Sequence, residues 1–299
     1  SNFSMANRAD FRGTGVAMIT PLKNDGSLNI EQLEVHTDRL IEKGVEYLVV
    51  LGTTAETPTL SKEEKLKIIE VTRKVNSGRV PMVVGAGGNS TEEVVGWIRE
   101  IGTAGIDAYL SVAPYYNKPS QQGMKAHFSA IAASAELPLM LYNVPGRTGS
   151  NITADTTLEL AHELGSKIAA IKEASGDLSQ IMRIIRDKPE GFQVVSGDDA
   201  ITLAMISLGG SGVVSVIGNA LPDLFSSMVR DALAGDLDAA REKHYRILPL
   251  IDLIFREGNP CGVKALMEVL GYGASNLRLP LIPATNALVQ DLRSAAQRL

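Results

Sequence analysis

Lys172 lies near the end of Ile168–Ala174, an apolar segment with the length and composition of a buried strand. Burial removes water from an amine and favours its neutral form over the ammonium ion. A neutral amine is a nucleophile, and its natural target is a carbonyl carbon, with which it forms a Schiff base. Taken alone, the segment fits better with a strand-end lysine whose ammonium group reaches solvent. The other polar residues of the chain favour the chemical interpretation.

Tyr142 precedes Lys172 by 30 residues, about the length of one strand–helix unit. We therefore expect the two side chains at similar heights on neighbouring strands, where a tyrosine hydroxyl can shuttle protons for a Schiff-base lysine. Further polar segments follow other apolar runs: Gly52-Thr53-Thr54-Ala55-Glu56, Pro114-Tyr115-Tyr116-Asn117, Tyr142-Asn143-Val144-Pro145-Gly146-Arg147-Thr148-Gly149 and Ser196-Gly197-Asp198-Asp199.

Each of these segments also has a purely structural interpretation. The threonines can cap a helix, the tyrosine pair can anchor an interface, and Arg147 can be a solvated surface residue. For Asp198 and Asp199 the structural interpretation is the better one, because both can cap and charge the start of the next helix. The glycine-rich segment 208–212 precedes an apolar run, whereas a phosphate site would follow it, so a tight turn is expected there.

The histidines give no reason to expect a metal. All four lie on expected helices, and none stands beside another histidine or a cysteine at ligand spacing: His36, His127, His162 and His244. A lysine imine stores electrons without a metal, so the expected chemistry needs neither a metal nor a cofactor.

Eight apolar runs alternate with amphipathic stretches, and this pattern predicts a parallel sheet. The number of runs and their roughly 30-residue repeat favour an α/β fold in which eight strands close into a β/α (TIM) barrel. The expected strands are Val16–Thr20, Tyr47–Leu51, Pro81–Gly85, Ala108–Ala113, Pro138–Asn143, Ile168–Ala174, Gln193–Ser196 and Gly212–Val216. In such a barrel the polar segments meet at the carboxyl ends of the strands.

The chain after Leu221 offers only helical stretches, expected at 222–234, 236–256, 260–270 and 283–297. The first completes the barrel, and the others form a C-terminal helical extension. No linker separates the parts, so we expect a barrel over 10–234 and an extension over 235–299 within one structural domain.

The composition is that of an ordinary globular protein, with 299 residues, 44% hydrophobic and 21% charged. A net charge of −5 and the lack of a long apolar run give no reason to expect nucleic acid or a membrane as a partner. The single cysteine, Cys261, excludes an internal disulfide and fits the cytoplasm. Residues 1–4 are expected to be a cloning remnant.

The polar segments together resemble the motifs of the dihydrodipicolinate synthase family, pyruvate-dependent class I aldolases related to N-acetylneuraminate lyase. The resemblance runs from about Thr14 to the C-terminus. The four polar segments and a fifth motif around Lys172, Ile171-Lys172-Glu173-Ala174-Ser175-Gly176-Asp177, appear in the family's order and spacing. One departure is Ala55, where the family usually has glycine, and an alanine would strain the loop slightly if the position needs a positive φ. The family fold, a β/α barrel with C-terminal helices, agrees with the one expected from the apolar runs.

The resemblance assigns the catalytic work to four residues. It implies that Lys172 forms an imine with pyruvate and that Tyr142 donates and accepts protons. Thr53 and Tyr116 would complete a hydroxyl relay, with Tyr116 reaching into a neighbouring subunit's site. The family is mostly tetrameric, a dimer of tight dimers, and a homo-oligomer of this kind is expected.

The resemblance also implies how the substrates are held. Thr54 would hold the pyruvate carboxylate, Gly197 and Val214 would line the pocket through their backbone, and Arg147 would bind the carboxylate of L-aspartate 4-semialdehyde. The implied reaction gives 4-hydroxy-tetrahydrodipicolinate, the first committed step towards diaminopimelate and lysine. The main alternative is a lyase for N-acetylneuraminate or a keto-deoxy sugar acid. Sialic-acid lyases typically lack an arginine at the position of Arg147, which favours the synthase. A non-catalytic barrel is more remote, because it has no reason to keep a buried amine.

Feedback by L-lysine is the last property that the resemblance raises. Sensitive members use an asparagine, a glutamate and a tyrosine, matched here by Asn89, Glu93 and Tyr115. Two further positions, often histidine or glutamate, are Lys62 and Lys65, whose ammonium groups would repel a lysine ligand. We therefore expect weak or absent inhibition at millimolar lysine. The alternative is that both side chains turn to solvent and Glu93 still recruits the ligand.

Overall fold

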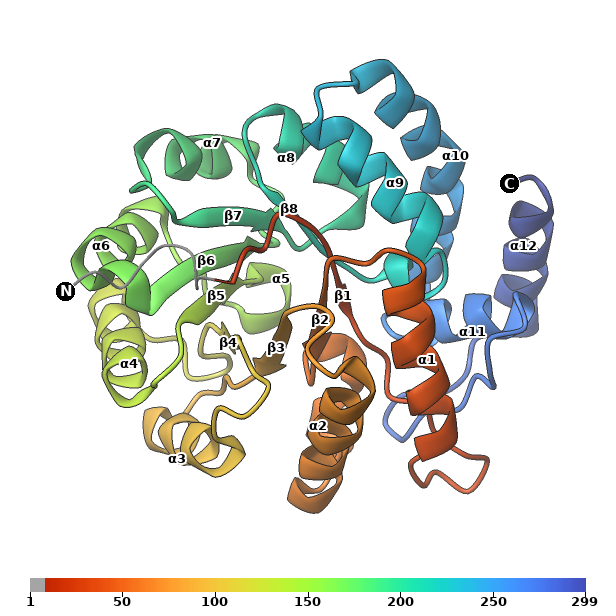
Figure 1. The fold of residues 1–299 in the computed structure, drawn as a ribbon, viewed down its shortest axis with the longest axis horizontal. Coiled ribbons are helices and arrows are strands. Elements are labelled where there is room, and N and C mark those ends of the chain that lie inside the picture. The colour runs from red at the N-terminus through yellow and green to blue at the C-terminus, as the bar shows by residue number, and fades with distance from the viewer. Residues whose placement is uncertain (1–8) are drawn as a thin grey trace.

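Eight parallel strands pair in sequence order, and β8 pairs with β1, so that the sheet closes into a barrel (Figure 1). The computed structural model describes residues 9–299, so the expected remnant at residues 1–4 lies outside the described residues. The strands are β1 Gly13–Ala17, β2 Tyr47–Val50, β3 Met82–Gly85, β4 Ala108–Val112, β5 Leu139–Asn143, β6 Ile168–Glu173, β7 Gln193–Ser196 and β8 Gly212–Ser215. The predicted barrel is confirmed.

β1 starts three residues earlier than the expected Val16, and the reason is a close contact inside the barrel. Gly15 lies against the ring of Tyr47, and a Cβ at this position would fall 2.2 Å from a ring carbon. The close approach requires a glycine, which hides the strand from a pattern based on apolar side chains. The backbone of Gly13–Val16 nevertheless pairs with β8 along its length.

Helices surround the barrel, and side-chain caps stand at the starts of several of them. Ser61 and Glu64 form a capping box at the start of α2, and the Ser90 hydroxyl accepts from Glu93 N at the start of α3. The helices are α1 Ile30–Glu42, α2 Lys62–Asn76, α3 Thr91–Ile101, α4 Gln121–Ser134, α5 Pro145–Thr148, α6 Ala154–Leu164, α7 Leu178–Asp187, α8 Thr202–Ser207, α9 Pro222–Leu233, α10 Leu237–Phe255, α11 Cys261–Val269 and α12 Asn286–Gln297.

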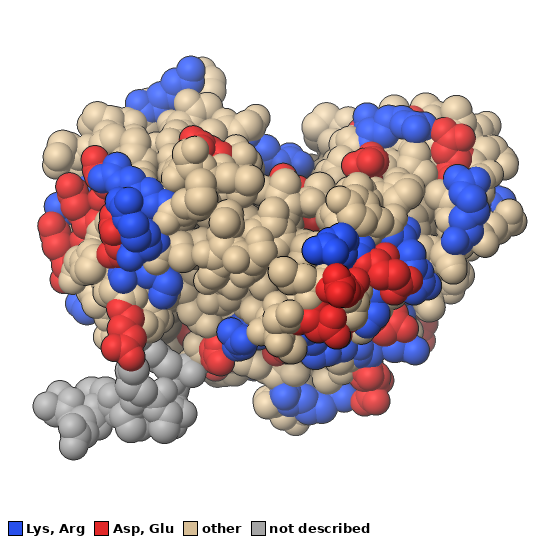
Figure 2. Space-filling view, turned by 90° about the horizontal axis from the view of Figure 1, so that it is seen from above, with Lys and Arg blue, Asp and Glu red and all other residues tan. Residues whose placement is uncertain are grey.

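The helices α10, α11 and α12 form a C-terminal extension that lies beside α9 and α1 (Figure 1). One hydrophobic cluster joins the two parts, because Val213 and Phe225 of the barrel belong to the same buried group as Ile251, Leu266 and Leu288 of the extension. On the face shown in Figure 2, acidic and basic side chains are interspersed. Over residues 9–299 no helix is long and apolar enough to cross a membrane.

Candidate active site

Lys172 on β6 and Tyr142 on β5 are register partners near the carboxyl ends of their strands. The Lys172 amine lies 4.0 Å from the centre of the Tyr142 ring, and the two residues are only 4% and 5% exposed. Among the described residues, the amine has no hydrogen-bond or ion-pair partner. A buried amine without a partner, beside a phenol, is the arrangement that a Schiff-base lysine and its proton shuttle require.

Gly197 lies against Lys172, and Val214 lies in the buried cluster that includes Tyr142. Gly197 follows β7, and a Cβ there would fall 3.1 Å from Cγ of Lys172 and 2.8 Å from Cβ of Ala174. The glycine therefore leaves room for the aliphatic stem of the lysine. Val214 on β8 is 1% exposed and belongs to the same buried cluster as Tyr142 inside the barrel.

The segment after β2 forms a 3₁₀ turn, Thr53–Ala55, at the mouth of the barrel. Thr54 is buried, and its hydroxyl oxygen accepts a hydrogen bond from Asn259 Nδ2 at 2.9 Å. A positive φ in this segment is found at Glu56, at 59°. Ala55 itself is buried without a left-handed backbone, so the condition under which an alanine would strain the loop is not met there.

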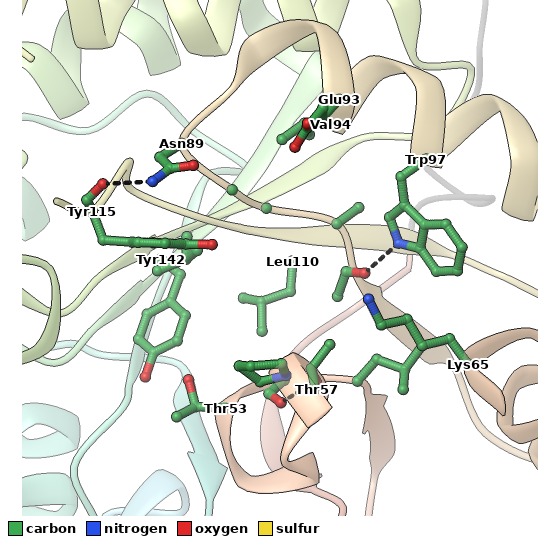
Figure 3. A pocket seen from close by; sticks show the side chains of 18 of the residues that line it. Thr53, Thr57, Lys65, Asn89, Glu93, Val94, Trp97, Leu110, Tyr115 and Tyr142 are labelled. Atoms are coloured by element: carbon green, nitrogen blue, oxygen red, sulfur yellow. Dashed lines mark hydrogen bonds between the residues drawn. The ribbon is translucent and has the colours of Figure 1, made fainter. Parts of the chain in front are cut away.

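Thr53 and Tyr142 line one end of a cavity of about 530 Å³, close to each other in Figure 3. The other end lies between α2 and α3, with Lys65 and Trp97 across from the tyrosine. All five residues predicted for a regulatory site line this same cavity: Lys62, Lys65, Asn89, Glu93 and Tyr115. A ligand at the far end would therefore lie in the same hollow as Thr53 and Tyr142.

Two predicted residues stand apart from this group. Arg147 lies on the single turn α5 and is exposed, and its guanidinium has no partner among residues 9–299. Tyr116 is 90% exposed and has a φ of 74°, a left-handed backbone that a tyrosine rarely adopts. Its side chain is therefore open to solvent and is not among the residues that line the cavity with Thr53 and Tyr142.

Asp199 departs from its expected role as a helix cap. Asp198 does cap the turn after β7, accepting from Ala200 N, whereas Asp199 is 2% exposed and accepts from the backbone N–H groups of Val216 and Ile217. Burial raises the pKa of Asp199 to about 6. It ties the turn after β7 to the segment after β8, both at the mouth. The expected tight turn before β8 is present, with Gly209 N and Gly210 N bonded to the end of α8.

Several residues around the site were not predicted. Asn143 and Glu173 follow Tyr142 and Lys172 on their strands, and the Asn143 amide donates to the Glu173 carboxylate at 2.6 Å. Ser175 and Gln180 donate to the same carboxylate, so the ends of β5 and β6 are held together. Polar residues within otherwise apolar strands were the available signal.

A second group that was not predicted comes from the C-terminal extension. Lys264 on α11 is 2% exposed and pairs with Glu56 at 2.7 Å, while Asn259 contacts Thr54. Burial lowers the pKa of Lys264, and the Glu56 carboxylate opposes this effect. A lysine within the apolar segment Cys261–Met267 was the signal here.

The comparisons with known proteins agree with this geometry. A family model described as the dihydrodipicolinate synthetase family matches residues 10–299. A curated 4-hydroxy-tetrahydrodipicolinate synthase of Parabacteroides distasonis is 50% identical over 290 residues, covering 97% of each chain. The chain belongs to the dihydrodipicolinate synthetase family. Members with these names are enzymes, and this chain is one as well.

Solved structures of the family superpose on nearly the whole chain. The dihydrodipicolinate synthase of Thermotoga maritima is 38% identical, with a TM-score of 0.93, covering 96% of this chain and 98% of its own. An enzyme of the family from Cyanidioschyzon merolae, solved with lysine bound, is 39% identical, also with a TM-score of 0.93, covering 97% and 99%.

Proposed function

We propose that the protein condenses pyruvate with L-aspartate 4-semialdehyde to give 4-hydroxy-tetrahydrodipicolinate, in the pathway to diaminopimelate and lysine. The observation that carries the proposal is the Lys172 amine, which is buried, lacks a partner among the described residues and lies 4.0 Å from the Tyr142 ring. Membership of the family, whose named relatives catalyse this reaction, supports it.

The proposed reaction uses the imine that Lys172 forms with pyruvate as an electron sink. The Lys172 amine attacks the ketone carbon of pyruvate and water leaves, giving an imine. Loss of a methyl proton gives an enamine, whose carbon attacks the aldehyde carbon of the semialdehyde. The amino group of the second substrate then displaces Lys172 and closes the six-membered ring. Tyr142 receives and returns the protons, with Thr53 beside it in the cavity. These steps need no cofactor.

Two kinds of group hold the substrates in this proposal. The Thr54 hydroxyl holds the pyruvate carboxylate, and Gly197 and Val214 supply backbone around it. Arg147 binds the carboxylate of the semialdehyde, because a planar guanidinium matches a carboxylate with two parallel hydrogen bonds. Its exposure at the mouth supports a role towards an incoming substrate.

A direct comparison of substrates tests the proposal against the sialic-acid and sugar-acid lyases. Purified protein is assayed with pyruvate plus L-aspartate 4-semialdehyde and, separately, with pyruvate plus N-acetylmannosamine. Only the first mixture is expected to give product. Turnover of the second mixture alone would show that the protein is a lyase and not the synthase. Absence of both activities would favour a non-catalytic barrel.

Tyr116 acts in the site of a neighbouring subunit in this proposal, within a homotetramer built from tight dimers. Its 90% exposure and left-handed backbone support a side chain that projects outward. A mixture of inactive Tyr116→Phe and inactive Lys172→Ala, allowed to exchange subunits, is expected to recover part of the activity. No recovery in verified mixed dimers would contradict the role in trans.

Weak feedback by L-lysine is the regulatory part of the proposal. The Lys62 ammonium pairs with Glu100, and the Lys65 ammonium lies 5.6 Å from the Trp97 ring on the cavity wall. Lys65 therefore lines the same cavity as Glu93 and Asn89, where a cationic side chain weakens binding of a cationic ligand. We expect little inhibition at millimolar lysine, and sub-millimolar inhibition in a steady-state assay would contradict this. A cytoplasmic location stays a prediction from the single Cys261.

A further inference from the structure

The C-terminal extension contacts the turn that carries Thr53 and Thr54 through two side chains. The amide of Asn259, which lies between α10 and α11, reaches the Thr54 hydroxyl, and the Lys264 ammonium reaches the Glu56 carboxylate at 2.7 Å. These contacts join parts of the chain that are more than 200 residues apart in the sequence. The extension therefore controls where a turn at the barrel mouth lies.

The ion pair fixes the position of the turn. Glu56 has a left-handed backbone and is 3% exposed, and both of its carboxylate oxygens are used. One oxygen accepts from Lys264 Nζ, and the other accepts from the backbone N–H of Arg278 at 3.1 Å. Because a buried carboxylate tolerates little displacement from its partners, the residues just before Glu56 have a fixed position.

The Asn259 contact fixes the direction of the Thr54 hydroxyl. Asn259 Nδ2 donates to the hydroxyl oxygen, so the hydroxyl hydrogen is left to point elsewhere. Residues 9–299 offer that hydrogen no acceptor. The Asn259 Oδ1 atom is itself buried without a partner, so the amide is not held by a network of its own. Thr54 is therefore presented as a hydrogen-bond donor at a site where an anion would accept.

We infer that Asn259 is a positioning residue for the reaction, because it orients the Thr54 hydroxyl as a donor to the carboxylate of the keto acid. The C-terminal extension then contributes a positioning residue to the site in addition to packing against the barrel. The inference rests on the proposed role of Thr54 in holding pyruvate.

Two substitutions at Asn259 separate orientation from packing. Asn259→Ala removes the donor and leaves the hydroxyl free to rotate, and kcat/KM for pyruvate is expected to fall about fivefold, the value of one neutral hydrogen bond. Asn259→Asp keeps the shape, but an ionised carboxylate accepts the Thr54 hydrogen and turns it away from the substrate. It is therefore expected to lower kcat/KM for pyruvate further, by roughly tenfold or more.

Three measurements distinguish a positioning role of Asn259 from a purely structural one. Both variants should leave kcat/KM for the semialdehyde and the melting temperature nearly unchanged. Asn259→Asp should regain pyruvate efficiency as the pH falls, because a protonated carboxyl can donate to Thr54 as the amide does. A milder effect for the isosteric aspartate than for alanine, or equal losses for both substrates, would overturn the inference.

A Thr54→Val variant separates failure of the inference from failure of the proposed role of Thr54. It should lower kcat/KM for pyruvate, and adding Asn259→Ala to it should cause no further loss. If Thr54→Val has no effect, the role of Thr54 is wrong and the inference falls with it. If Thr54→Val is impaired and both Asn259 variants are normal, the inference alone is wrong.

Discussion

Two lysines of this protein are almost completely buried, and their surroundings are opposite. Lys264 pairs with Glu56 at 2.7 Å and also donates to the Asn276 carbonyl at 2.6 Å. Lys172 has the Tyr142 ring 4.0 Å away and, among the described residues, neither an anion nor a hydrogen-bond acceptor. The exposed fractions, 2% and 4%, do not distinguish them.

In the proposed function, this difference separates a structural lysine, Lys264, from a catalytic one, Lys172. Removing an amine from water costs free energy, and Glu56 offsets that cost for Lys264 within the folded chain. Nothing among the described residues offsets it for Lys172, whose amine makes no hydrogen bond or ion pair with them. The same contrast extends to the barrel mouth. There the Arg147 guanidinium and the Thr54 hydroxyl hydrogen have no partner among residues 9–299, and we propose that they bind substrates, whereas Asn259 and Lys264 of the extension contact other residues of the protein.

The largest effect on this contrast is expected from Lys172→Ala. Turnover should fall about 10³-fold or more, because the nucleophile is lost. The melting temperature should stay the same or rise, since no ion pair is broken. Steady-state rates and thermal unfolding measure both. A clear loss of stability would mean that Lys172 also stabilises the folded state.

Lys264→Met should give the reverse result, a large loss of stability. Leaving Glu56 buried without its cation is expected to lower the free energy of unfolding by roughly 3–5 kcal/mol, measured by urea denaturation. Lys67→Met is the matched control, because Lys67 forms an exposed pair with Glu70 and its loss should cost under about 1 kcal/mol. Adding Glu56→Gln to Lys264→Met should restore part of the loss. Equal stability of Lys264→Met and the control would refute the structural role.

Arg147→Ala tests whether unpaired groups at the mouth serve the substrates. Loss of a charge-assisted contact should raise the barrier for use of the semialdehyde by about 2–4 kcal/mol, with imine formation from pyruvate much less affected. Separate kcat/KM values for the two substrates measure this, and Arg241→Ala on α10 is an exposed control. Equal losses for both substrates would indicate a structural role for the α5 turn.

Asp199 is an intermediate case, a buried charge held by backbone N–H groups. Burial raises its pKa from 3.8 to about 6, so the folded state binds its proton more tightly than the unfolded state. Its contribution to stability is full below about pH 3.8 and is lost as the pH rises through about 6, by up to about 3 kcal/mol. Urea denaturation across pH 4–7 should show this dependence weakened in Asp199→Asn. An unchanged pH profile would assign the dependence to other groups.

The barrel and the Lys172–Tyr142 pair were predictable because both depend on local, repeated patterns. The alternation of apolar runs with amphipathic stretches predicted the order of the strands. The 30-residue spacing of Tyr142 and Lys172 predicted that they lie at the same height on neighbouring strands. The Asn259 and Lys264 contacts were not predictable, since each joins residues more than 200 positions apart and no local pattern specifies its partner. The start of β1 was missed because a glycine occupies the position against which Tyr47 packs. The role of Asp199 was missed because its backbone partners lie in the segment that follows β8.

Borohydride trapping tests the central contrast most directly. The protein is incubated with pyruvate and borohydride and then digested. The masses of the peptides that contain Lys172 and Lys264 are measured by mass spectrometry. A reduced pyruvyl adduct is expected on Lys172 and not on Lys264, although both lysines are buried. Absence of the adduct from Lys172, or equal labelling of the two lysines, would contradict the assignment of Lys172 as the Schiff-base residue.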